Sequence, residues 1–522
     1  MQIVAYGAQD VFLTGSPQIT FWKVTYRRHT NFAMESIEQT FNGQADFGRR
    51  VQCTISRNGD LAYRTYLQVT LPEVTTSDAA YARWLDYPGE QLINLVEVEV
   101  GGQRIDRQYG DWMHIWNQLT LTAAQEPGYN KMVGQTTELT YITDPSFADV
   151  DGPCEDGAPP QVCAPRNALP ETTLYVPLQF WFCCNPGLAL PIIALQYHEI
   201  KINLELKPLD ECLWATNDLT TITKPNAAFN KSLVAASLYV DYIFLDTDER
   251  RRMAQNPHEY LIEQLQFTGD ESIGSSSNKI KLNFNHPCKE LIWVVQPDAH
   301  VDYCRAFETG TQLSAVLGAQ PFNYTDGVDV LPNALHAFNS DVGSKGAEAV
   351  IFQDASGNYT FQNAGAVGTT GVSNESTWGD SGPNFDQTTS ALVSDAGAFV
   401  LAETALGMHC WGQNPVVTAK LQLNGQDRFS EREGTYFDQV QPYQHHTRAP
   451  DTGINVYSFG LRPEEHQPSG TCNFSRIDNA TLQLVVSNNA VGGDKTCKVR
   501  VYATNYNVFR VISGMGGLAY SN

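Results

Sequence analysis

The sequence lacks the short motifs by which many enzymes are recognised. Its 522 residues contain no GxxxxGK[ST] phosphate loop, no GxSxG nucleophile turn and no HExxH zinc motif. The nearest approaches to a zinc motif, His198-Glu199 and His258-Glu259, have no second histidine four residues on. We therefore predict a protein that is not an enzyme, without catalytic residues, metal ligands or cofactor.

Basic residues are also scarce. The chain has 34 Lys and Arg against 57 Asp and Glu, and its formal net charge is −23. Because nucleic-acid binding needs a dense Lys/Arg face, this balance predicts no direct sequence-specific binding to DNA or RNA. One local exception is the N-terminal end, where Lys23, Arg27 and Arg28 stand against Asp10 alone. These three side chains are candidates for contact with an anionic partner, with a solvated turn as the preferred alternative.

The 11 cysteines show no CxxC spacing, so free buried thiols are expected. Cys154 and Cys163 flank a Pro/Gly-rich loop and are a candidate pair under oxidation. The first twelve residues lack the basic segment and apolar core of a secretory signal, which predicts synthesis in the cytosol. The longest apolar stretch, 174–197, holds three prolines, and we expect two buried strands around a loop there rather than a membrane span.

The composition favours a β-rich globular protein of two domains. Aromatic residues make up 11%, and 40 Gly and 26 Pro are suited to short strands joined by tight turns. A chain of this length exceeds what one hydrophobic core usually serves. Apolar and polar residues alternate strictly in 199–206, 96–100 and 421–423, which predicts strands with one buried face.

An internal repeat indicates two copies of one β-fold. Three pairs of segments follow in the same order in the two halves: 51–72 with 280–297, VEVGGQ ending at 103 with LQLNGQ ending at 426, and 198–206 with 480–486. Gly101-Gly102 and Asn424-Gly425 are hairpin-type turns. Between the copies, Asp246 with Glu249 predicts a helix start and Asn256-Pro257 its end.

The spacing within the repeat predicts a large insertion in the second copy. Pro72 and Gly102 lie 30 positions apart, whereas Pro297 and Gly425 lie 128 apart. The Gly-rich, acidic stretch at about 305–400 accounts for the excess and is expected on the surface. Three of the Asn-x-Ser/Thr sequons fall in it, at Asn323, Asn358 and Asn374, and these are candidate surface modification sites, with unmodified Asn as the default.

The strongest signal is a set of long blocks spread over most of the chain. They are GAQDVFLTGSPQITFWKVTYRRHTNFAMESIEQTFNG at 7–43, RNGDL at 57–61, PLQFWFCCNPGLALPIIALQYHEIKIN at 177–203, LDTDERRRMAQNPHEYLIEQ at 245–264, LNGQDRFSEREGTYFDQVQPYQHHT at 423–447, INVYSFGLRPEEHQPSGTCNFSRIDNATLQL at 454–484, and NYNVFRVISGMGGLAYSN at 505–522. Together they resemble the major capsid proteins of nucleocytoplasmic large DNA viruses, such as the phycodnaviruses, iridoviruses, mimiviruses and marseilleviruses.

The resemblance implies an all-β double jelly roll, that is, two tandem eight-stranded jelly rolls with short helices in connectors and loops. It implies a structural protein of the virion capsid that forms pseudo-hexagonal homotrimeric capsomers of a large icosahedral virus. The expected partners are neighbouring capsomers, minor capsid proteins and a nearby internal membrane, with assembly in the host cytoplasm. Two similar domains in each of three chains place six similar wedges around one axis.

The predicted organisation has five parts. They are an N-terminal arm at 1–26, a first jelly roll at 27–245, a connector at 246–257, a second jelly roll with the insertion at 258–513, and a C-terminal tail at 514–522.

A jelly-roll protein that binds or processes glycans is the alternative function, because tandem jelly rolls also serve in glycan binding and a fold alone does not decide function. Two polar clusters are the candidate sites considered. His445-His446 is a candidate metal site of the cupin kind, but adjacent residues on a strand point to opposite faces, and Glu464, Glu465 and His466 do not restore cupin spacing. The second cluster offers a candidate carboxylate pair for glycoside hydrolysis, against a salt-linked loop as the preferred alternative. Its members are Asp427, Arg428, Glu431, Arg432 and Glu433.

Overall fold

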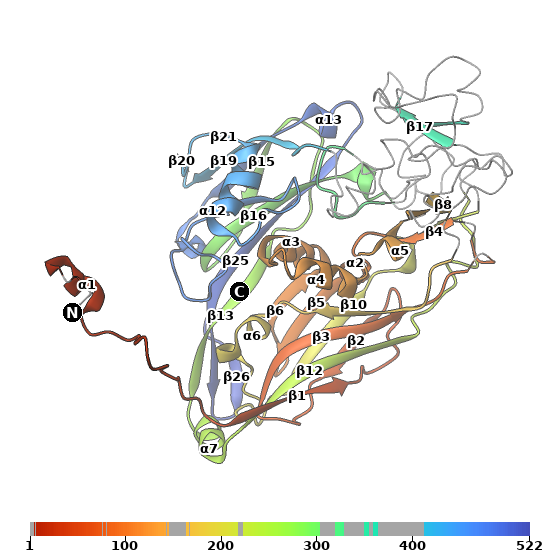
Figure 1. The fold of residues 1–522 in the computed structure, drawn as a ribbon. Coiled ribbons are helices and arrows are strands. Elements are labelled where there is room, and N and C mark those ends of the chain that lie inside the picture. Colours follow the sequence, from red (N-terminus) through yellow and green to blue (C-terminus); the bar gives the residue numbers. More distant parts are fainter. Residues whose placement is uncertain are drawn as a thin grey trace.

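The computed structural model shows two β-sandwiches in one chain, the first at the lower right and the second at the upper left of Figure 1. It describes residues 5–521 except 6, 76, 80, 142, 146–162, 166–167, 218–222, 303–318, 328–348, 354–358 and 364–411, and it describes 143–145, 163–165, 349–353 and 359–363 by backbone alone.

The first sandwich consists of two four-stranded antiparallel sheets. One has the order β1 (Phe32–Gln39), β12 (Ala235–Leu245), β3 (Leu61–Leu71), β9 (Thr172–Pro177). The other has the order β2 (Arg50–Thr54), β10 (Ile200–Leu206), β5 (Ile93–Val100), β6 (Gln103–Tyr109). Numbered one to eight along the chain, these strands give sheet orders 1-8-3-6 and 2-7-4-5, which is the jelly-roll arrangement.

The second sandwich repeats this order. Its first sheet runs β13 (His258–Phe267), β25 (Cys497–Ile512), β16 (Pro287–Pro297), β22 (Asn455–Ser458), with β14 (Glu271–Ile273), β23 (Cys472–Asn473) and β26 (Met515–Leu518) attached. Its second sheet runs β15 (Ser277–Leu282), β24 (Ala480–Val486), β19 (Val416–Leu423), β20 (Gln426–Asp427), with β21 (Arg432–Glu433) beside β19. The predicted all-β double jelly roll is confirmed.

The repeat seen in the sequence matches equivalent strands. The pairs β2–β3 and β15–β16, β5 and β19, and β10 and β24 hold the same places in the two sandwiches. Both turn dipeptides close hairpins, with Val100 opposite Gln103 and Leu423 opposite Gln426. Gly101 and Gly102 have φ of 59° and 85°, and Asn424 and Gly425 have 52° and 79°. Asn and Gly tolerate this left-handed backbone conformation, which explains why these dipeptides form both hairpin turns.

The connector helix also agrees with the sequence. Helix α7 (Thr247–Gln255) begins after Asp246, whose carboxylate accepts a hydrogen bond from the Thr247 amide at 2.9 Å. Asn256, in extended conformation, ends the helix one residue before Pro257.

The remaining described elements are short and lie in loops. They are α1 (Val11–Thr14), β4 (Tyr81–Trp84), α2 (Pro88–Leu92), α3 (Gly110–Thr120), α4 (Glu126–Val133), α5 (Thr137–Thr140), β7 (Thr143–Pro145), β8 (Cys163–Pro165), α6 (Trp181–Cys184), β11 (Leu213–Thr216), β17 (Ala349–Gln353), β18 (Tyr359–Asn363), the π-helical turn η7 (Tyr436–Val440), α12 (Gln441–His445), α13 (Asn488–Val491) and five 3-10 turns at Ala8–Asp10, Pro186–Leu188, Leu209–Glu211, Asp298–His300 and Phe474–Arg476. Among the residues that the structure describes, no helix has the length and apolar character needed to cross a membrane.

The apolar stretch 174–197 differs from its prediction. It holds only one strand, β9, followed by α6 and a 3-10 turn at Pro186–Leu188. The prediction of a second strand was wrong because burial, which apolar runs do signal, does not choose between a strand and a compact loop. Phe180 and Phe182 are fully buried in the first core without strand pairing.

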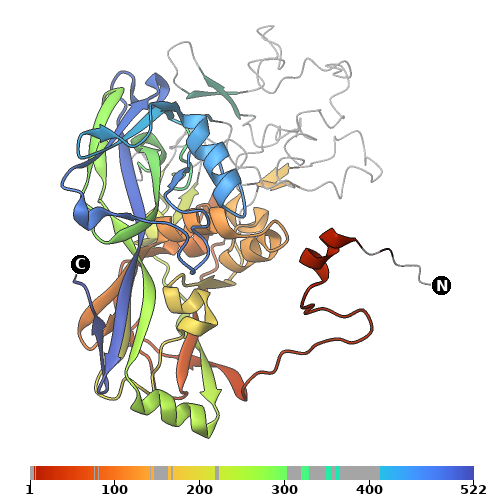
Figure 2. The same cartoon turned by 90° about the vertical axis from the view of Figure 1, so that its left-hand side faces the viewer.

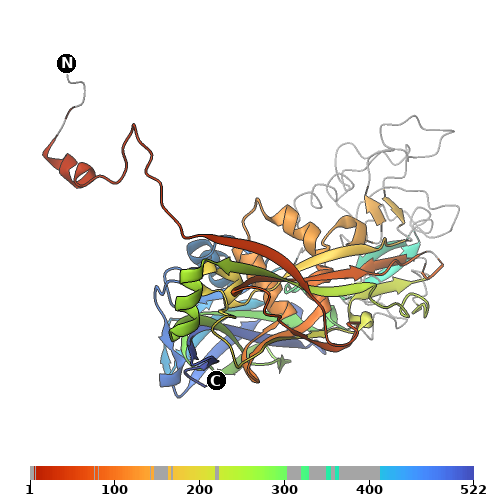
Figure 3. The same ribbon diagram turned by 90° about the horizontal axis from the view of Figure 1, so that it is seen from below.

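The two halves share structure more than the predicted bounds imply. Ile262, Phe509 and Val511, from β13 and β25 of the second half, lie in the core of the first sandwich. Strand β26 pairs with β25, so the predicted tail at 514–522 begins as part of a sheet. At the other end, β1 starts at Phe32, and the exposed arm extends through residue 31 rather than 26. Figures 2 and 3 show this arm projecting away from both sandwiches.

The predicted surface insertion is wrong for its part at 319–327. Phe322 and Tyr324 there are 7% and 1% exposed and belong to a core between the two halves. Aromatic side chains of this size stabilise the molecule when they are buried. The prediction used the average composition of 305–400, which hides two buried aromatic residues. Most of the rest of that range, including Asn358 and Asn374, lies outside the described residues, as does Cys154.

Candidate functional site

A third hydrophobic core lies between the two sandwiches. The first half contributes α2, α3 and α4, and the second half contributes its large sheet. The side chains that meet there include Tyr87, Trp112, Ile115, Leu119, Tyr129 and Val133 on one side and Ile292, Val294, Phe322, Tyr324, Ile454, Val456 and Tyr502 on the other. Burying each of these large side chains contributes roughly 1.5–3 kcal/mol, so the two sandwiches form one continuous body.

Arg500 of β25 joins the halves electrostatically. Its guanidinium lies 2.8 Å from the Asp111 carboxylate of α3 and 2.8 Å from that of Asp270. Burial by itself raises the pKa of Asp111, but Arg500 and Lys207 outweigh it and hold the pKa below its usual value. The Asp111 carboxylate is therefore charged at neutral pH and depends on its cations for compensation.

A second ion pair joins the connections between strands five and six of each jelly roll. In the first half this connection, between β6 and β9, carries α3 and α4. In the second, between β20 and β22, it carries α12. Arg448, after α12, pairs with Glu126 of α4 at 2.6 Å, and its backbone amide donates to the Leu119 carbonyl at 3.2 Å. Equivalent loops of the two copies thus contact each other.

A buried polar cluster supports the first of these loops. The Glu90 carboxylate lies 2.8 Å from His114 Nδ1 and accepts hydrogen bonds from Asn117 Nδ2 and the Tyr129 hydroxyl. Burial, followed by the Glu90 charge, raises the pKa of Tyr129 well above its usual value, so this phenol stays protonated. The adjoining cavity of about 10 Å³ has room for about one water molecule, far less than a small-molecule site needs.

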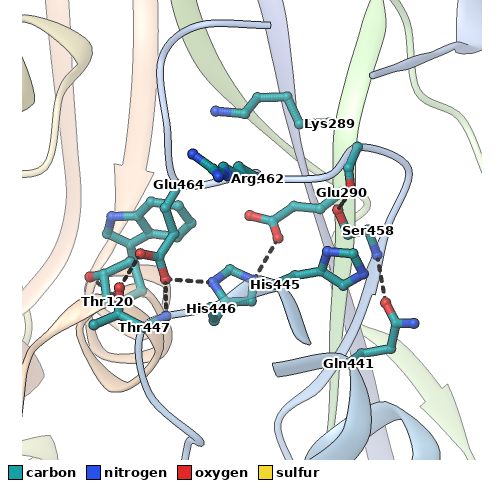
Figure 4. A network of polar contacts seen from close by, with 12 residues as sticks. Thr120, Lys289, Glu290, Gln441, His445, His446, Thr447, Ser458, Arg462 and Glu464 are labelled. Carbon is teal, nitrogen blue, oxygen red and sulfur yellow. Dashed lines mark hydrogen bonds and ion pairs between the residues drawn. The ribbon is translucent and has the colours of Figure 1, made fainter. Parts of the chain in front are cut away.

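His446 lies between two carboxylates in the network of Figure 4. Its Nε2 is 2.8 Å from Glu290 and its Nδ1 is 2.9 Å from Glu464. Burial alone would lower the pKa of His446, but the two carboxylates raise it to about 9. The same contacts outweigh burial at Glu464 and lower the pKa of that carboxyl. A protonated imidazolium donating to two carboxylates is a structural clamp.

The predicted strand at His445-His446 was wrong, because His445 ends α12 and His446 follows the helix. The two rings nevertheless have separate partners. His445 Nδ1 contacts the Leu461 carbonyl at 3.0 Å, whereas His446 takes the carboxylates. Among the described residues no group of three or more His, Cys, Asp or Glu side chains has the arrangement of a metal site.

The neighbouring candidates also have structural partners. His466 and Lys289 lie 3.2 and 2.8 Å from the Glu263 carboxylate, and Glu465 pairs with Arg462. His198 contacts Gly516, and His258 Nε2 contacts the Met253 carbonyl at 2.6 Å. These histidines serve contacts between segments.

The proposed carboxylate cluster at 427–433 lies on a hairpin edge, where its side chains are mostly exposed. Asp427 pairs with Lys420 at 2.7 Å, Glu431 accepts from the Thr418 hydroxyl at 2.6 Å, and the Arg432 guanidinium lies 4.3 Å from the centre of the Tyr436 ring. The salt-linked alternative fits these contacts.

Asn323 does not fit a surface modification site. It is 4% exposed, and its Nδ2 donates hydrogen bonds to Gln320 Oε1 and the Gly327 carbonyl. Thr325 of the same sequon donates its hydroxyl hydrogen bond to Asn323 Oδ1 at 2.6 Å. The prediction was wrong here, because Asn and Thr two residues apart also build a self-bonded turn.

Lys23, Arg27 and Arg28 lie in the exposed arm, as do several large apolar side chains. Phe12, Ile19, Phe21 and Trp22 are each more than 80% exposed. A soluble domain rarely presents so much apolar surface in one segment, so the arm has the composition of a contact segment.

Sequence reasoning missed Asp111, Arg500, Glu126 and the Glu90 cluster. Arg500 occupies an ordinary polar position in the alternating strand β25, and alternation assigns such a position to solvent. Helix α3, which covers Arg500, comes from the other half of the chain, so the sequence around Arg500 does not predict this contact.

Comparison with known proteins agrees with the double jelly roll. A family model described as "Large eukaryotic DNA virus major capsid protein" matches residues 249–517, and one described as "Major capsid protein N-terminus" matches residues 20–246. The chain is 73% identical to the major capsid protein of Phaeocystis pouchetii virus and 69% identical to that of Chrysochromulina ericina virus, covering 100% of this chain and 99% of each relative. In the solved PBCV-1 virus capsid, a chain that is 33% identical superposes with a TM-score of 0.61 over 96% of this chain and all of its own length. The chain belongs to the family of major capsid proteins of large eukaryotic DNA viruses.

Proposed function

We propose that this chain is the principal structural subunit of an icosahedral virion shell and assembles as a homotrimer with a pseudo-hexagonal outline. The observation that carries the proposal is the repetition of sheet orders 1-8-3-6 and 2-7-4-5 within one chain, with the copies joined by a buried core. Three such chains around an axis present six similar sandwiches. A three-fold object then fills a six-fold lattice position.

Light scattering of the purified chain tests this assembly. A stable trimer should persist at micromolar concentration, because permanent complexes bury about 2,000 Å² or more. A soluble, folded monomer at that concentration contradicts the proposal.

We propose that the arm faces the inside of the shell, where Lys23, Arg27 and Arg28 contact anionic lipid headgroups of an internal membrane. The exposed basic and aromatic side chains of the arm support this. Flotation with vesicles containing anionic lipid should recover the trimer, and replacing the three basic residues by Ala should reduce recovery. The matched control is Lys279→Ala with Lys281→Ala, two exposed lysines of β15. An equal loss in both variants contradicts a role specific to the arm.

Neighbouring capsomers and minor capsid proteins are the other partners we propose, with assembly in the host cytoplasm and no enzymatic role. A glycan-processing enzyme needs convergent polar groups in a concave site. The described clusters around Glu90, His446 and Asp427 instead direct their polar atoms at each other.

A further inference from the structure

Two cysteines lie directly opposite each other in the second sandwich. Cys288 of β16 is the antiparallel partner of Cys472 in β23, and the adjacent pair is Pro287 with Asn473. Directly opposed residues of an antiparallel pair have Cα atoms about 4.5 or 5.5 Å apart, depending on the hydrogen-bond pattern. Both values lie within the range of about 4.4–6.8 Å that a disulfide requires.

Their side chains lie on the same face of the sheet. Cys288 is fully buried in the core of the second sandwich, and Cys472 is partly buried and packs against the same core. Opposed residues on an antiparallel pair share a face, so the register and the burial agree. Both thiols are free in this structure.

The pair lies at one end of a loop that carries part of the His446 network. The loop is attached to β16 at both ends, since the Phe459 amide donates to the Lys289 carbonyl at 2.9 Å and the Phe474 amide to the His286 carbonyl at 3.0 Å. Between these points lies Glu464, one of the two carboxylates that hold His446. A covalent bond at Cys472 would prevent this loop from leaving the sheet.

We propose that Cys288 and Cys472 form a cross-strand disulfide when the assembled protein meets an oxidising environment, and that this bond fixes the 459–474 loop on β16. The oxidant is a low-molecular-weight disulfide such as oxidised glutathione. The Cys472 thiolate attacks one sulfur of the oxidant, giving a mixed disulfide and one released thiolate. The Cys288 thiolate then attacks the Cys472 sulfur and releases the second. The two protein thiols lose two protons and two electrons, and one small disulfide becomes two thiols.

The order of the two steps follows from exposure. Cys472 is the partly exposed member of the pair, whereas Cys288 is 0% exposed. Burial raises the pKa of both thiols, so little thiolate is present at neutral pH and oxidation should be slow. Cys472 should therefore attack the oxidant first. The reaction should accelerate as pH rises, because more of the thiol is then deprotonated.

The test is peptide mapping of the full-length assembled protein after incubation with oxidised glutathione, without reduction. We expect a linked peptide pair containing Cys288 and Cys472, and an unfolding midpoint several degrees above that of a sample kept in dithiothreitol. Cys472→Ala should remove both the linked pair and the difference in midpoint. The matched control is Cys497→Ala, because Cys497 is also a buried thiol of the same sheet but stands opposite Pro297 and Ile273. That variant should keep the linked pair and the difference in midpoint.

Two results would overturn the proposal. One is a lasting glutathione adduct on Cys472 with Cys288 still free. The other is a midpoint difference between oxidised and reduced protein that survives in Cys472→Ala. Because Cys472 is only partly buried, Cys472→Ser provides a second variant if the alanine variant folds poorly.

Discussion

The two jelly rolls have the same strand order but contribute ion-pair partners of opposite charge to the interface between them. The first half presents carboxylates at the interface, with Asp111 and Glu126 on α3 and α4. The second half presents the cations, with Arg500 on β25 and Arg448 after α12. The alternation of apolar and polar residues produces the same fold in both halves. Individual charged residues then determine how the two halves contact each other. The shared architecture and the contact between the two copies are therefore encoded by different residues.

The largest effect is expected from breaking the charge contact between the halves. Arg500→Ala leaves the Asp111 carboxylate in a poorly solvated place without its main cation, which should lower the free energy of unfolding by about 3–5 kcal/mol. The matched control is Arg510→Ala in the same strand, whose exposed pair with Glu259 contributes at most about 1 kcal/mol. Denaturant unfolding of both variants measures the difference. Equal losses of unfolding free energy in the two variants would show that the Arg500 ion pair contributes no more than an exposed one.

The His446 clamp, which has no counterpart among the described residues of the first half, should give the second half a distinctive pH dependence. The pKa of His446 rises from 6.5 to about 9 on folding, so its contribution is fully present below pH 6.5 and is lost as pH rises through about 9. A shift of this size corresponds to roughly 3 kcal/mol. The unfolding free energy of His446→Gln should therefore fall less between pH 6.5 and 9 than that of the unaltered protein.

The control for this experiment is His445→Gln, at the adjacent, partly exposed ring whose contact is the Leu461 carbonyl. It should keep the pH dependence of the unaltered protein. The prediction fails if the His446→Gln curve runs parallel to it over the whole range.

A smaller effect should distinguish the two equivalent hairpins. An Ala Cβ at Gly425 meets no atom within 4 Å, so Gly425→Ala should cost about 1 kcal/mol for the left-handed backbone alone. An Ala Cβ at Gly101 would lie 2.4 Å from His198 Nδ1, which adds about 1–3 kcal/mol of overpacking. Thermal unfolding should rank Gly101→Ala below Gly425→Ala, and equal midpoints would mean that the His198 ring moves aside freely.

The smallest effect on stability is expected from removing the arm. Residues 7–31 are almost entirely exposed, so the loss of these residues in a variant that starts at residue 32 removes little buried surface from the sandwiches. The unfolding midpoint should change by no more than about 2 °C, because surface changes are usually within ±0.5 kcal/mol. A large fall in the midpoint would show that the arm packs on a sandwich in solution.

Much of the architecture could be predicted from the sequence because it rests on local patterns. Alternation identified β5, β10 and β19, turn dipeptides identified two hairpins, and Asp246 with Pro257 bounded α7. Repetition of these patterns in one order was enough to predict two copies of one fold. The resemblance of long blocks to a known family then specified the jelly roll.

The interface could not be predicted in this way. The 319–327 segment looked like surface loop because its neighbours are Gly-rich, yet Phe322 and Tyr324 complete the core between the halves. The sequon at Asn323 was also misleading, because its burial depends on segments that are far away in the chain. Arg500 and Asp111 are 389 positions apart, and only the folded arrangement brings them together.

The most direct test of the shell-subunit account is an electron-microscopy reconstruction of the purified assembly viewed along its symmetry axis. The account predicts a three-fold particle with six similar lobes and a nearly hexagonal outline, in which alternate lobes are the first and second jelly rolls of each chain. A particle with three lobes, or a two-fold dimer, would contradict it.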